Sequence, residues 1–407
     1  MIEYYTKFNL HLYMFAGLQL PNGYLNTKFY YLYYLLMIFS DFTVFGSLVT
    51  IGIHFFSRNV PLSERCFSGF TVISTAQSTS KLIYCYLYKN KFKEIFQMWE
   101  KSYNNYKVRT DLEEKIAIKQ RVVKYLSLFL FTVMVGPMIP WGSLPLFVKF
   151  VSLFIPSMPF KNFIAVPAWF PFDPLISPAF ELTALFQGFG ALYVNAKTIA
   201  FDCLLYSLGC LHIVYSEHLR QTFGRIIGRI HVADNGKLSY ALNDGNILAN
   251  QLDDDNLRED KGTQNFVVHM EKDIIQWVKH HQELIRVGNA LRKLYSPVLT
   301  MQFFLQLLIL CTNAFVVASA KLDAVQLTFC GAYVIGNILQ LFVLSHLGEK
   351  ITSESRRLMD DAYGKAWYAC HPSLRSYLKI IFLQCQKPFK MSALGVFPLS
   401  IETFKNV

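Results

Sequence analysis

Long apolar stretches separated by basic segments constrain this chain more than any other feature of its sequence. A bilayer core about 30 Å thick is crossed by a helix of about 20 apolar residues. Six stretches have this length and character: residues 29–56, 66–88, 125–148, 182–205, 298–320 and 324–344. Hydrophobic residues make up 53% of the chain and charged residues only 16%. The sequence therefore predicts an all-α, multi-pass membrane bundle with six full transmembrane helices, not a soluble multidomain protein.

Lysine and arginine fall on alternate connections between these stretches. The second connection is rich in both from Lys89 to Lys124, and the fourth and sixth are also basic. The first, third and fifth together carry only Arg58, Arg65, Lys149, Lys161 and Lys321. Because basic connections remain in the cytoplasm, the amino terminus is predicted to be cytoplasmic as well. This orientation is opposite to that of a G-protein-coupled receptor, so no G protein is expected as a partner.

The composition excludes several classes of protein. The net charge of +11 lies in short basic blocks beside apolar stretches, which favours attraction to the inner leaflet of the plasma membrane over binding of nucleic acid. The eight cysteines have no CxxC or zinc-ligand spacing, and the adjacent His280 and His281 point to different helix faces. No P-loop, GxSxG or HExxH motif is present. We therefore expect no metal, no cofactor and no enzymatic activity.

Four charged residues interrupt the predicted crossings, namely Asp41, Lys81, Lys197 and Asp202. A charge at the bilayer centre costs about 2.5–3.5 kcal/mol on insertion scales. Asp41 is therefore expected to meet a nearby hydroxyl or a neighbouring helix, or to make a functional polar contact inside the bundle. Lys81 is expected to extend its side chain to the lipid headgroups. Lys197 and Asp202 are five residues apart, a poor spacing within a helix, and no ion pair is predicted between them.

Amphipathic patterns continue beyond the crossings. An aromatic stripe follows the second crossing at positions 92, 95, 96, 99, 103 and 106, and a longer apolar stripe over residues 266–295 precedes the fifth crossing. These cytoplasmic stripes are expected to pack against each other or against neighbouring subunits. Residues 355–386 mix aromatic with basic side chains and predict a further cytoplasmic amphipathic helix. Pro388 ends this pattern, because proline lacks the amide hydrogen that a helix needs.

Short motifs in two regions of the chain carry a resemblance. Near the carboxyl terminus they are D-A-Y at 361–363, W-Y at 367–368, Q-K-P-F at 386–389 and F-P-L-S-I-E-T-F at 397–404. The third connection contains P-F at 159–160 and A-W-F-P-F-D at 168–173. Together with the length, the crossings and the inverted orientation, these motifs resemble the insect odorant receptor family over the whole chain.

The resemblance implies an odorant-gated, non-selective cation channel with seven transmembrane helices in the plasma membrane of olfactory neurons. Family members form tetramers, usually with a shared co-receptor subunit, around a pore that the last helix lines. A small volatile odorant binds within the outer membrane half. Residues 1–348 would then form the transmembrane domain with the odorant cavity, residues 349–390 a cytoplasmic anchor for assembly, and residues 391–407 the start of an incomplete seventh helix.

The inferred orientation also predicts particular contacts. Side chains in the outer halves of helices two to five that could line an odorant cavity are Ile73, Gln77, Met138, Trp141, Phe189, Tyr193 and Phe315. Each of them could instead serve helix packing or contact lipid. Large side chains that could anchor the subunits are Tyr363, Trp367, Tyr368, Pro388 and Phe389. Their alternative role is burial within the same subunit.

Two other functions remain open from the sequence. The sequence ends three residues after Phe404, so the product could be a truncated, non-conducting subunit or regulatory partner that assembles without supplying a pore helix. The related gustatory receptor family is a further alternative, although its usual Thr-Tyr and Gln-Phe signature does not occur at the end of this chain. Co-expression with the co-receptor and current recording would distinguish a conducting from a non-conducting subunit.

The predicted orientation can be tested with an epitope placed at Met1. Antibody staining is expected only after cells are permeabilised, because the basic connections hold the amino terminus inside. Staining of intact cells would contradict the orientation.

Overall fold

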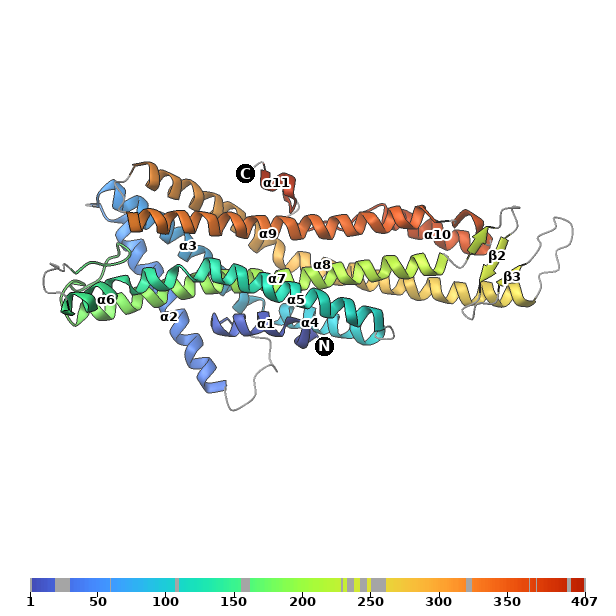
Figure 1. The fold of residues 1–407 in the computed structure, drawn as a ribbon, viewed down its shortest axis with the longest axis horizontal. Coiled ribbons are helices and arrows are strands. Elements are labelled where there is room, and N and C mark those ends of the chain that lie inside the picture. The colour runs from blue at the N-terminus through green and yellow to red at the C-terminus, as the bar shows by residue number, and fades with distance from the viewer. Residues whose placement is uncertain are drawn as a thin grey trace.

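Most of the helices lie side by side along one long axis and form an elongated bundle (Figure 1). The computed structural model describes residues 2–18, 30–58, 60–106, 110–154, 162–227, 230–232, 238–241, 247–249, 261–319, 324–365, 367–370, 372–393 and 397–405. The long helices within them are α1 (Ile2–Phe15), α2 (Tyr30–Phe56), α3 (Leu62–Leu87), α4 (Lys89–Tyr106), α5 (Thr110–Val135), α6 (Met138–Phe154), α7 (Ala179–Ile227), α8 (Lys261–Ser319), α9 (Ala324–Tyr363) and α10 (Pro372–Cys385). The predicted helical membrane bundle is thus confirmed.

Two small β-sheets accompany the helices in the described part of the chain. Strands β1 (Ile230–Val232), β2 (Leu238–Ala241) and β3 (Ile247–Ala249) form an antiparallel sheet between α7 and α8. Its register pairs Tyr240 with Ile230 on one side and with Leu248 on the other. Strands β4 (Ser392–Ala393) and β5 (Phe397–Pro398) pair antiparallel after α10.

Helix α7 is the axis of the bundle. Every residue from Tyr193 to Ser216 is buried, and α7 packs against α1, α2, α3, α5, α6, α8 and α9. A helix that is apolar on all sides is stable only where neighbours cover each side. The neighbours that cover α7 on every side place it at the centre of the bundle.

Five helical stretches among the described residues are long and apolar enough to cross a membrane. They are Tyr31–Phe56, Leu112–Phe154, Ala179–Ile227, Val267–Ala318 and Ala324–Tyr363. The second predicted crossing, now α3, is not one of them, because serine, threonine and Lys81 lower its hydropathy. It still packs inside the bundle, against α2, α7 and α8.

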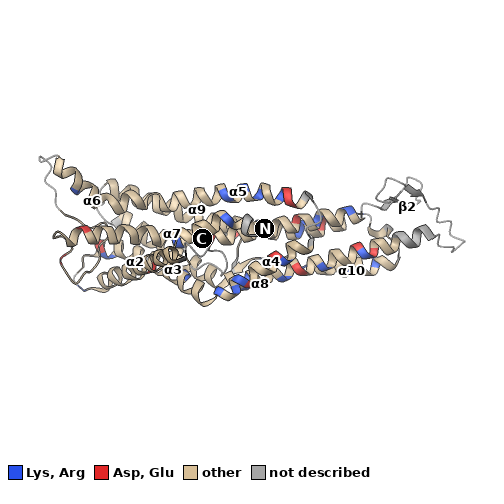
Figure 2. Ribbon diagram, turned by 90° about the horizontal axis from the view of Figure 1, so that it is seen from below, with Lys and Arg blue, Asp and Glu red and all other residues tan. Residues whose placement is uncertain are grey.

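Charged residues gather in one half of the molecule. Figure 2 shows Lys, Arg, Asp and Glu concentrated on α4, α8, α10 and the first part of α5, whereas α2, α3 and α6 are mostly uncharged. Side chains that face hydrocarbon must be apolar, because lipid offers no hydrogen bonds to a polar group. The uncharged half is therefore the part of the bundle that a bilayer can surround.

The third predicted crossing is divided into two helices. Residues 125–148 were predicted as one continuous helix, but α5 ends at Val135 and α6 begins at Met138. Gly136 and Pro137 lie between them, and Pro137 has no amide hydrogen to bond the carbonyl one turn earlier. The Gly136 amide still donates to the carbonyl of Thr132 at 2.8 Å, so the break comes directly after it.

The carboxyl-terminal region also differs from its prediction. Residues 355–386 are not one helix, because α9 ends at Tyr363, next to Gly364, and a short 3-10 turn (Trp367–Ala369) precedes α10. Pro372 is the first residue of α10, where a missing amide hydrogen costs no helical bond. The predicted domain boundary between residues 348 and 349 lies within the continuous α9.

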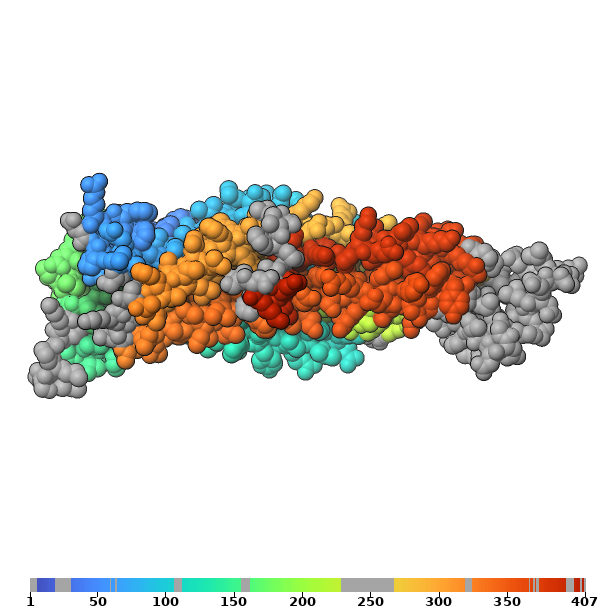
Figure 3. Space-filling model, turned by 90° about the horizontal axis from the view of Figure 1, so that it is seen from above, coloured from blue at the N-terminus to red at the C-terminus, as the bar shows by residue number. Residues whose placement is uncertain are grey.

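The segment after α10 does not start a helix at residue 391. Instead, β4 and β5 precede a short helix, α11 (Ile401–Lys405). Pro398 cannot donate a backbone hydrogen bond, and Ser400 directly precedes α11, where serine is a favoured residue. Helix α11 packs on α9, and Figure 3 shows it on the outer face of the bundle.

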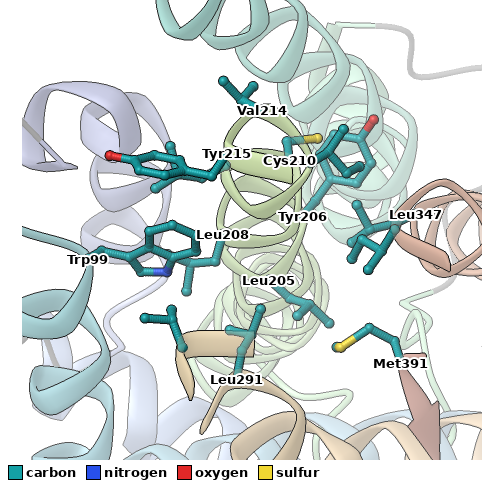
Figure 4. Close-up of a cluster of buried hydrophobic side chains, with 14 of the residues drawn as sticks. Trp99, Leu205, Tyr206, Leu208, Cys210, Val214, Tyr215, Leu291, Leu347 and Met391 are labelled. Carbon is teal, nitrogen blue, oxygen red and sulfur yellow. The ribbon is translucent and has the colours of Figure 1, made fainter. Parts of the chain in front are cut away.

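The predicted cytoplasmic stripes pack within the chain. Trp99 of α4 is fully buried, and its ring centroid lies 5.1 Å from that of Tyr215 on α7. Phe92 meets Tyr295 of α8 edge to face at 5.7 Å. Figure 4 shows Trp99, Tyr215 and Leu291 converging on one buried cluster. Neighbouring subunits are therefore not needed to cover the stripe on α4.

Helices α6 and α7 approach each other most closely where two glycines face. A methyl group added to Gly142 would lie 2.6 Å from the Cα of Gly188. Small residues of this kind let helix backbones meet inside membranes, where packing stabilises the helix pair. The contact holds α6 against α7 beside the cavity described below.

We expect Gly142→Ala to lower the melting temperature of the detergent-purified protein, because the two backbones must separate. Gly331→Ala is the matched control, since no atom lies within 4 Å of its added methyl group. The control should be neutral or stabilise by up to about 1 kcal/mol, the helix propensity difference between alanine and glycine. Equal shifts in the two variants would contradict the close contact.

Candidate functional site

A mostly apolar cavity lies at the end of the bundle where residues 162–178 connect α6 to α7. Its volume is about 60 Å³. Its walls come from α2, α3, α6, α7 and α9, with one residue from the connection. The lining side chains are Ser47, Thr50, Ile51, Phe70, Thr71, Ser74, Thr75, Met138, Trp141, Val166, Phe186, Gln187, Gly190, Ala191, Val194, Asn195, Phe329 and Tyr333.

Stacked aromatic rings form one wall of this cavity. The ring of Trp141 lies parallel to that of Phe329, with centroids 4.2 Å apart and planes at 12°. Phe329 stacks in turn on Tyr333 at 6.2 Å, and Tyr333 lies 5.7 Å from Phe70. Flat, rigid rings give a large apolar contact area with little loss of side-chain freedom. This wall suits a small ligand that is itself apolar or aromatic.

Most polar groups around the cavity already have partners. The hydroxyl of Tyr333 donates to Ser74, and Thr71 and Thr75 donate to carbonyls one turn back on α3. The indole N–H of Trp141 is buried and has no hydrogen-bond acceptor among the described residues. The cavity therefore combines an apolar surface with a few polar groups, as small-molecule sites usually do.

The connection between α6 and α7 is tied down over the cavity. Gln187 of α7 donates its amide to the carbonyl of Val166 at 2.6 Å and accepts the Val166 amide at 3.3 Å. The amide of Trp169 donates to the carbonyl of Thr50 on α2 at 3.0 Å. Because these bonds attach the connection to two helices, it forms a fixed cover on this end.

The structure brings two of the predicted ligand contacts together in this lining, Met138 and Trp141. Ile73 lies just outside it and packs against the same cluster of side chains. Gln77 is buried further along α3, and its amide nitrogen has no partner among the described residues. Tyr193 is buried among Val44 and Val194 and does not line the cavity.

Two other predicted contacts face outward. Phe189 and Phe315 are 42% and 48% exposed and line no part of the cavity. Phe189 follows Gly188 and packs edge to face on Phe39 of α2, with centroids 5.4 Å apart. Helix rotation decides which side chains point inward, and the sequence does not fix it. Phe70 of α3 was missed for the same reason. Phe329 and Tyr333 belong to α9, the sixth crossing, from which no ligand contact was predicted.

Two ion pairs connect α7 to its neighbours, a buried one with α3 and a partly buried one with α2. Lys81 donates to Asp202 at 2.7 Å, and the two side chains are 1% and 4% exposed. The other carboxylate oxygen of Asp202 accepts from Gln302 of α8 at 2.8 Å and from Gln340 of α9. Lys81 thus does not extend to the headgroups as predicted, because a carboxylate on α7 meets it inside the bundle.

The second ion pair joins α7 to α2. Lys197 donates to Asp41 at 2.8 Å and to the hydroxyl of Ser40 at 3.0 Å. It also donates to the carbonyl of Gly17, which follows α1, at 3.2 Å. Tyr86 of α3 donates to the second oxygen of Asp41. Asp41 therefore has the expected partner on a neighbouring helix, and Lys197 and Asp202 belong to different pairs, as expected.

The predicted anchor residues divide between buried and exposed positions. Phe389 stacks on His212 at 4.9 Å, and Trp367 meets Phe382 at 5.2 Å, so both pack within the chain. Pro388 is partly buried beside Phe389. Tyr363 and Tyr368 are each 63% exposed. These two tyrosines are the predicted anchor residues that another subunit could reach.

Comparison with known proteins agrees with this architecture. The family model described as 7tm Odorant receptor matches residues 62–407. The match covers most of the chain, which therefore belongs to the odorant receptor family.

Individual relatives show the same relationship. The odorant receptor coreceptor of Anopheles gambiae is 19% identical in an alignment 431 positions long, which covers 91% of this chain and 87% of that protein. The coreceptor of Aedes aegypti is 27% identical over 134 residues, covering 32% of this chain and 27% of the relative. The insect olfactory receptor OR5 from Machilis hrabei, solved in complex with eugenol, superposes with a TM-score of 0.76 at 15% identity. That superposition covers 100% of this chain and 94% of the receptor and supports the fold.

Removing one partner of a buried ion pair should destabilise the protein strongly. We expect Lys81→Met to cost about 3–5 kcal/mol, because Asp202 would remain buried without its counter-charge. The double variant Lys81→Met/Asp202→Leu should melt at a higher temperature than Lys81→Met alone. Lys149→Met is the control, since Lys149 and its partner Glu181 are partly exposed, and it should melt close to the wild type. A double variant no more stable than Lys81→Met would contradict the coupling.

Proposed function

We propose that the chain is a subunit of an odorant-gated, non-selective cation channel in the plasma membrane of olfactory neurons. It works as a receptor and not as an enzyme, in a tetramer with the odorant co-receptor. The observation that carries this proposal is the covered apolar cavity at one end of a bundle that belongs to the odorant receptor family. The similarity to the coreceptor of Anopheles gambiae over most of the chain supports assembly with such a partner.

The chemistry of the cavity suggests the class of ligand. Trp141, Phe329 and Tyr333 offer stacked faces, and the Trp141 indole offers a hydrogen-bond donor. A small volatile with an aromatic or apolar body and an acceptor oxygen would match both features. The cavity, with its volume of about 60 Å³, must widen to admit a molecule of this size. Eugenol, bound by the Machilis receptor of similar fold, is such a molecule. We place the ligand against Met138 and Trp141, and not against the outward-facing Phe189 and Phe315.

The proposed orientation puts the cavity on the outer side of the membrane and the amino terminus in the cytoplasm. The distribution of charge supports it, because the half with α4 and α10 carries most of the lysine and arginine. In this orientation the covered end faces the extracellular side, where an odorant arrives, and the exposed Tyr363 and Tyr368 lie in the cytoplasmic part that would anchor neighbouring subunits.

The cavity assignment can be tested by recording odorant-evoked currents in cells that also express the co-receptor of Anopheles gambiae. An odorant panel that includes eugenol first identifies an agonist. Trp141→Ala should then raise the half-maximal concentration by about tenfold, the equivalent of about 1.4 kcal/mol, because a stacked wall is lost. Phe147→Ala is the control, because Phe147 lies on the same helix, is 62% exposed and does not line the cavity. This variant should leave the response unchanged.

The outcomes separate the proposal from its alternatives. An unchanged concentration dependence in Trp141→Ala would place the ligand elsewhere. Absence of any current from a chain that reaches the cell surface with the co-receptor would favour a non-conducting subunit.

A further inference from the structure

A second cavity lies in the other, charged half of the bundle. Its volume is about 230 Å³, and its walls come from α7, α8, α9, the end of α10 and the segment 386–389. It is separate from the odorant cavity and shares no lining residue with it. The residues that matter for its chemistry are His212, His281, Arg292, Ser355, Lys387 and Phe389.

The lining carries positive charge without compensation. Arg292 and Lys387 both line the cavity, and the lining contains no aspartate or glutamate. Neither side chain has a carboxylate within ion-pair distance in the described part of the chain. The nearby Glu354 faces Arg220 at 3.8 Å and Arg357 at 2.8 Å. Burial raises the pKa of the lining thiol Cys385 to about 12, so it adds no negative charge at neutral pH.

The cavity also contains a buried nitrogen atom that lacks a partner. His212 is 3% exposed. Its ring interacts with the Leu284 backbone of α8, but its Nε2 has no hydrogen bond of normal geometry within the described residues. The imidazole is held in place by stacking on Phe389 and by close approach to α8, where a methyl group on Gly288 would lie 2.7 Å from Nε2. Buried polar atoms in native proteins nearly always have a partner, so an unsatisfied one points to a missing ligand or water.

Further donors surround the same space. Ser355 accepts the Phe389 amide at 2.8 Å, which leaves its own hydroxyl hydrogen free to donate. The guanidinium of Arg292 lies 5.7 Å from the centroid of the Phe389 ring, a cation–π contact that restricts its position. His281 adds a second imidazole to the lining. Arginine, lysine, histidine and serine thus converge on one cavity that lacks carboxylates.

We infer that this cavity binds a phosphate-bearing anion. The planar guanidinium of Arg292 can hold two phosphate oxygens at once, and Lys387 supplies a compact second charge. His212 and Ser355 can donate to the remaining phosphate oxygens. A carboxylate has only two oxygens and would leave some of these donors unused. The phosphate belongs either to a soluble metabolite or to a lipid headgroup, since the recognition chemistry is the same.

Such an anion would bridge two parts of the chain that already meet at Phe389. Arg292 belongs to α8, whereas Lys387 lies on the segment that leads from α10 to β4 and α11. A ligand held by both would fix this segment against α8. The site would therefore regulate the position of the carboxyl-terminal segment independently of the odorant cavity.

The test measures melting of the purified full chain in phosphatidylcholine nanodiscs. Inositol hexakisphosphate, as the soluble probe, should raise the melting temperature in a saturable way, and nanodiscs that contain phosphatidylinositol bisphosphate test the lipid source without it. Arg292→Gln/Lys387→Gln should abolish the shift. Arg356→Gln/Lys379→Gln is the matched control, because it removes one arginine and one lysine that are exposed and outside the cavity, and it should keep the shift.

A measurement on the wild type covers the case in which the cavity variant fails to fold. Acetylation of lysines by a water-soluble ester, followed by mass spectrometry, should slow several-fold at Lys387 when the anion is bound and stay unchanged at Lys379. Protection by the soluble probe identifies a metabolite, and protection only in the phosphoinositide nanodiscs identifies a headgroup. Equal rates at Lys387 with and without either anion, or an equal melting shift in both double variants, would overturn the inference.

Discussion

The two ion pairs on α7 hold this bundle in register. Lys197 and Asp202 are five residues apart, so they project about 140° apart around the helix. Each therefore meets a different neighbour, Asp41 on α2 and Lys81 on α3. A charge left alone in an apolar interior costs several kcal/mol, so α7 cannot rotate or slide without losing both partners. Apolar packing alone would not specify the rotation of a helix that is hydrophobic on every side.

The Lys81–Asp202 pair connects the centre of the bundle with the wall of the apolar cavity. Asp202 accepts from Gln340 of α9, which in turn accepts from Gln306 at 3.1 Å. Gln306 also donates to Asn337, whose amide bonds the carbonyl of Tyr333 at 2.8 Å. Tyr333 lines the cavity. A continuous set of hydrogen bonds therefore fixes the position of α9 relative to Asp202 and to the cavity. The cavity wall is therefore preorganised by groups that no ligand touches.

The sequence predicted the fold better than the site, for physical reasons. Apolar length and the placement of basic residues are properties of single segments, so the crossings and the buried stripe at Trp99 could be found from them. The partners of Lys81 and Lys197 lie more than 100 residues away in the chain, and no local pattern encodes them. The sequence did not show in which direction each side chain points. It therefore could not separate Met138 and Trp141, which line the cavity, from Phe189, which faces outward.

The two cavities differ in how their polar groups are satisfied, and this difference bears on what each can bind. Around the first, hydroxyls such as Thr75 bond to their own helix, so a ligand gains mainly from stacking and from exclusion of water. Around the second, Arg292 and Lys387 have no carboxylate partner in the described residues, so an anionic ligand would gain from charge and hydrogen bonds. An apolar volatile would leave the second set unsatisfied, and an anion would find no counter-charge in the first. The two cavities thus offer chemically distinct environments and share no lining residue.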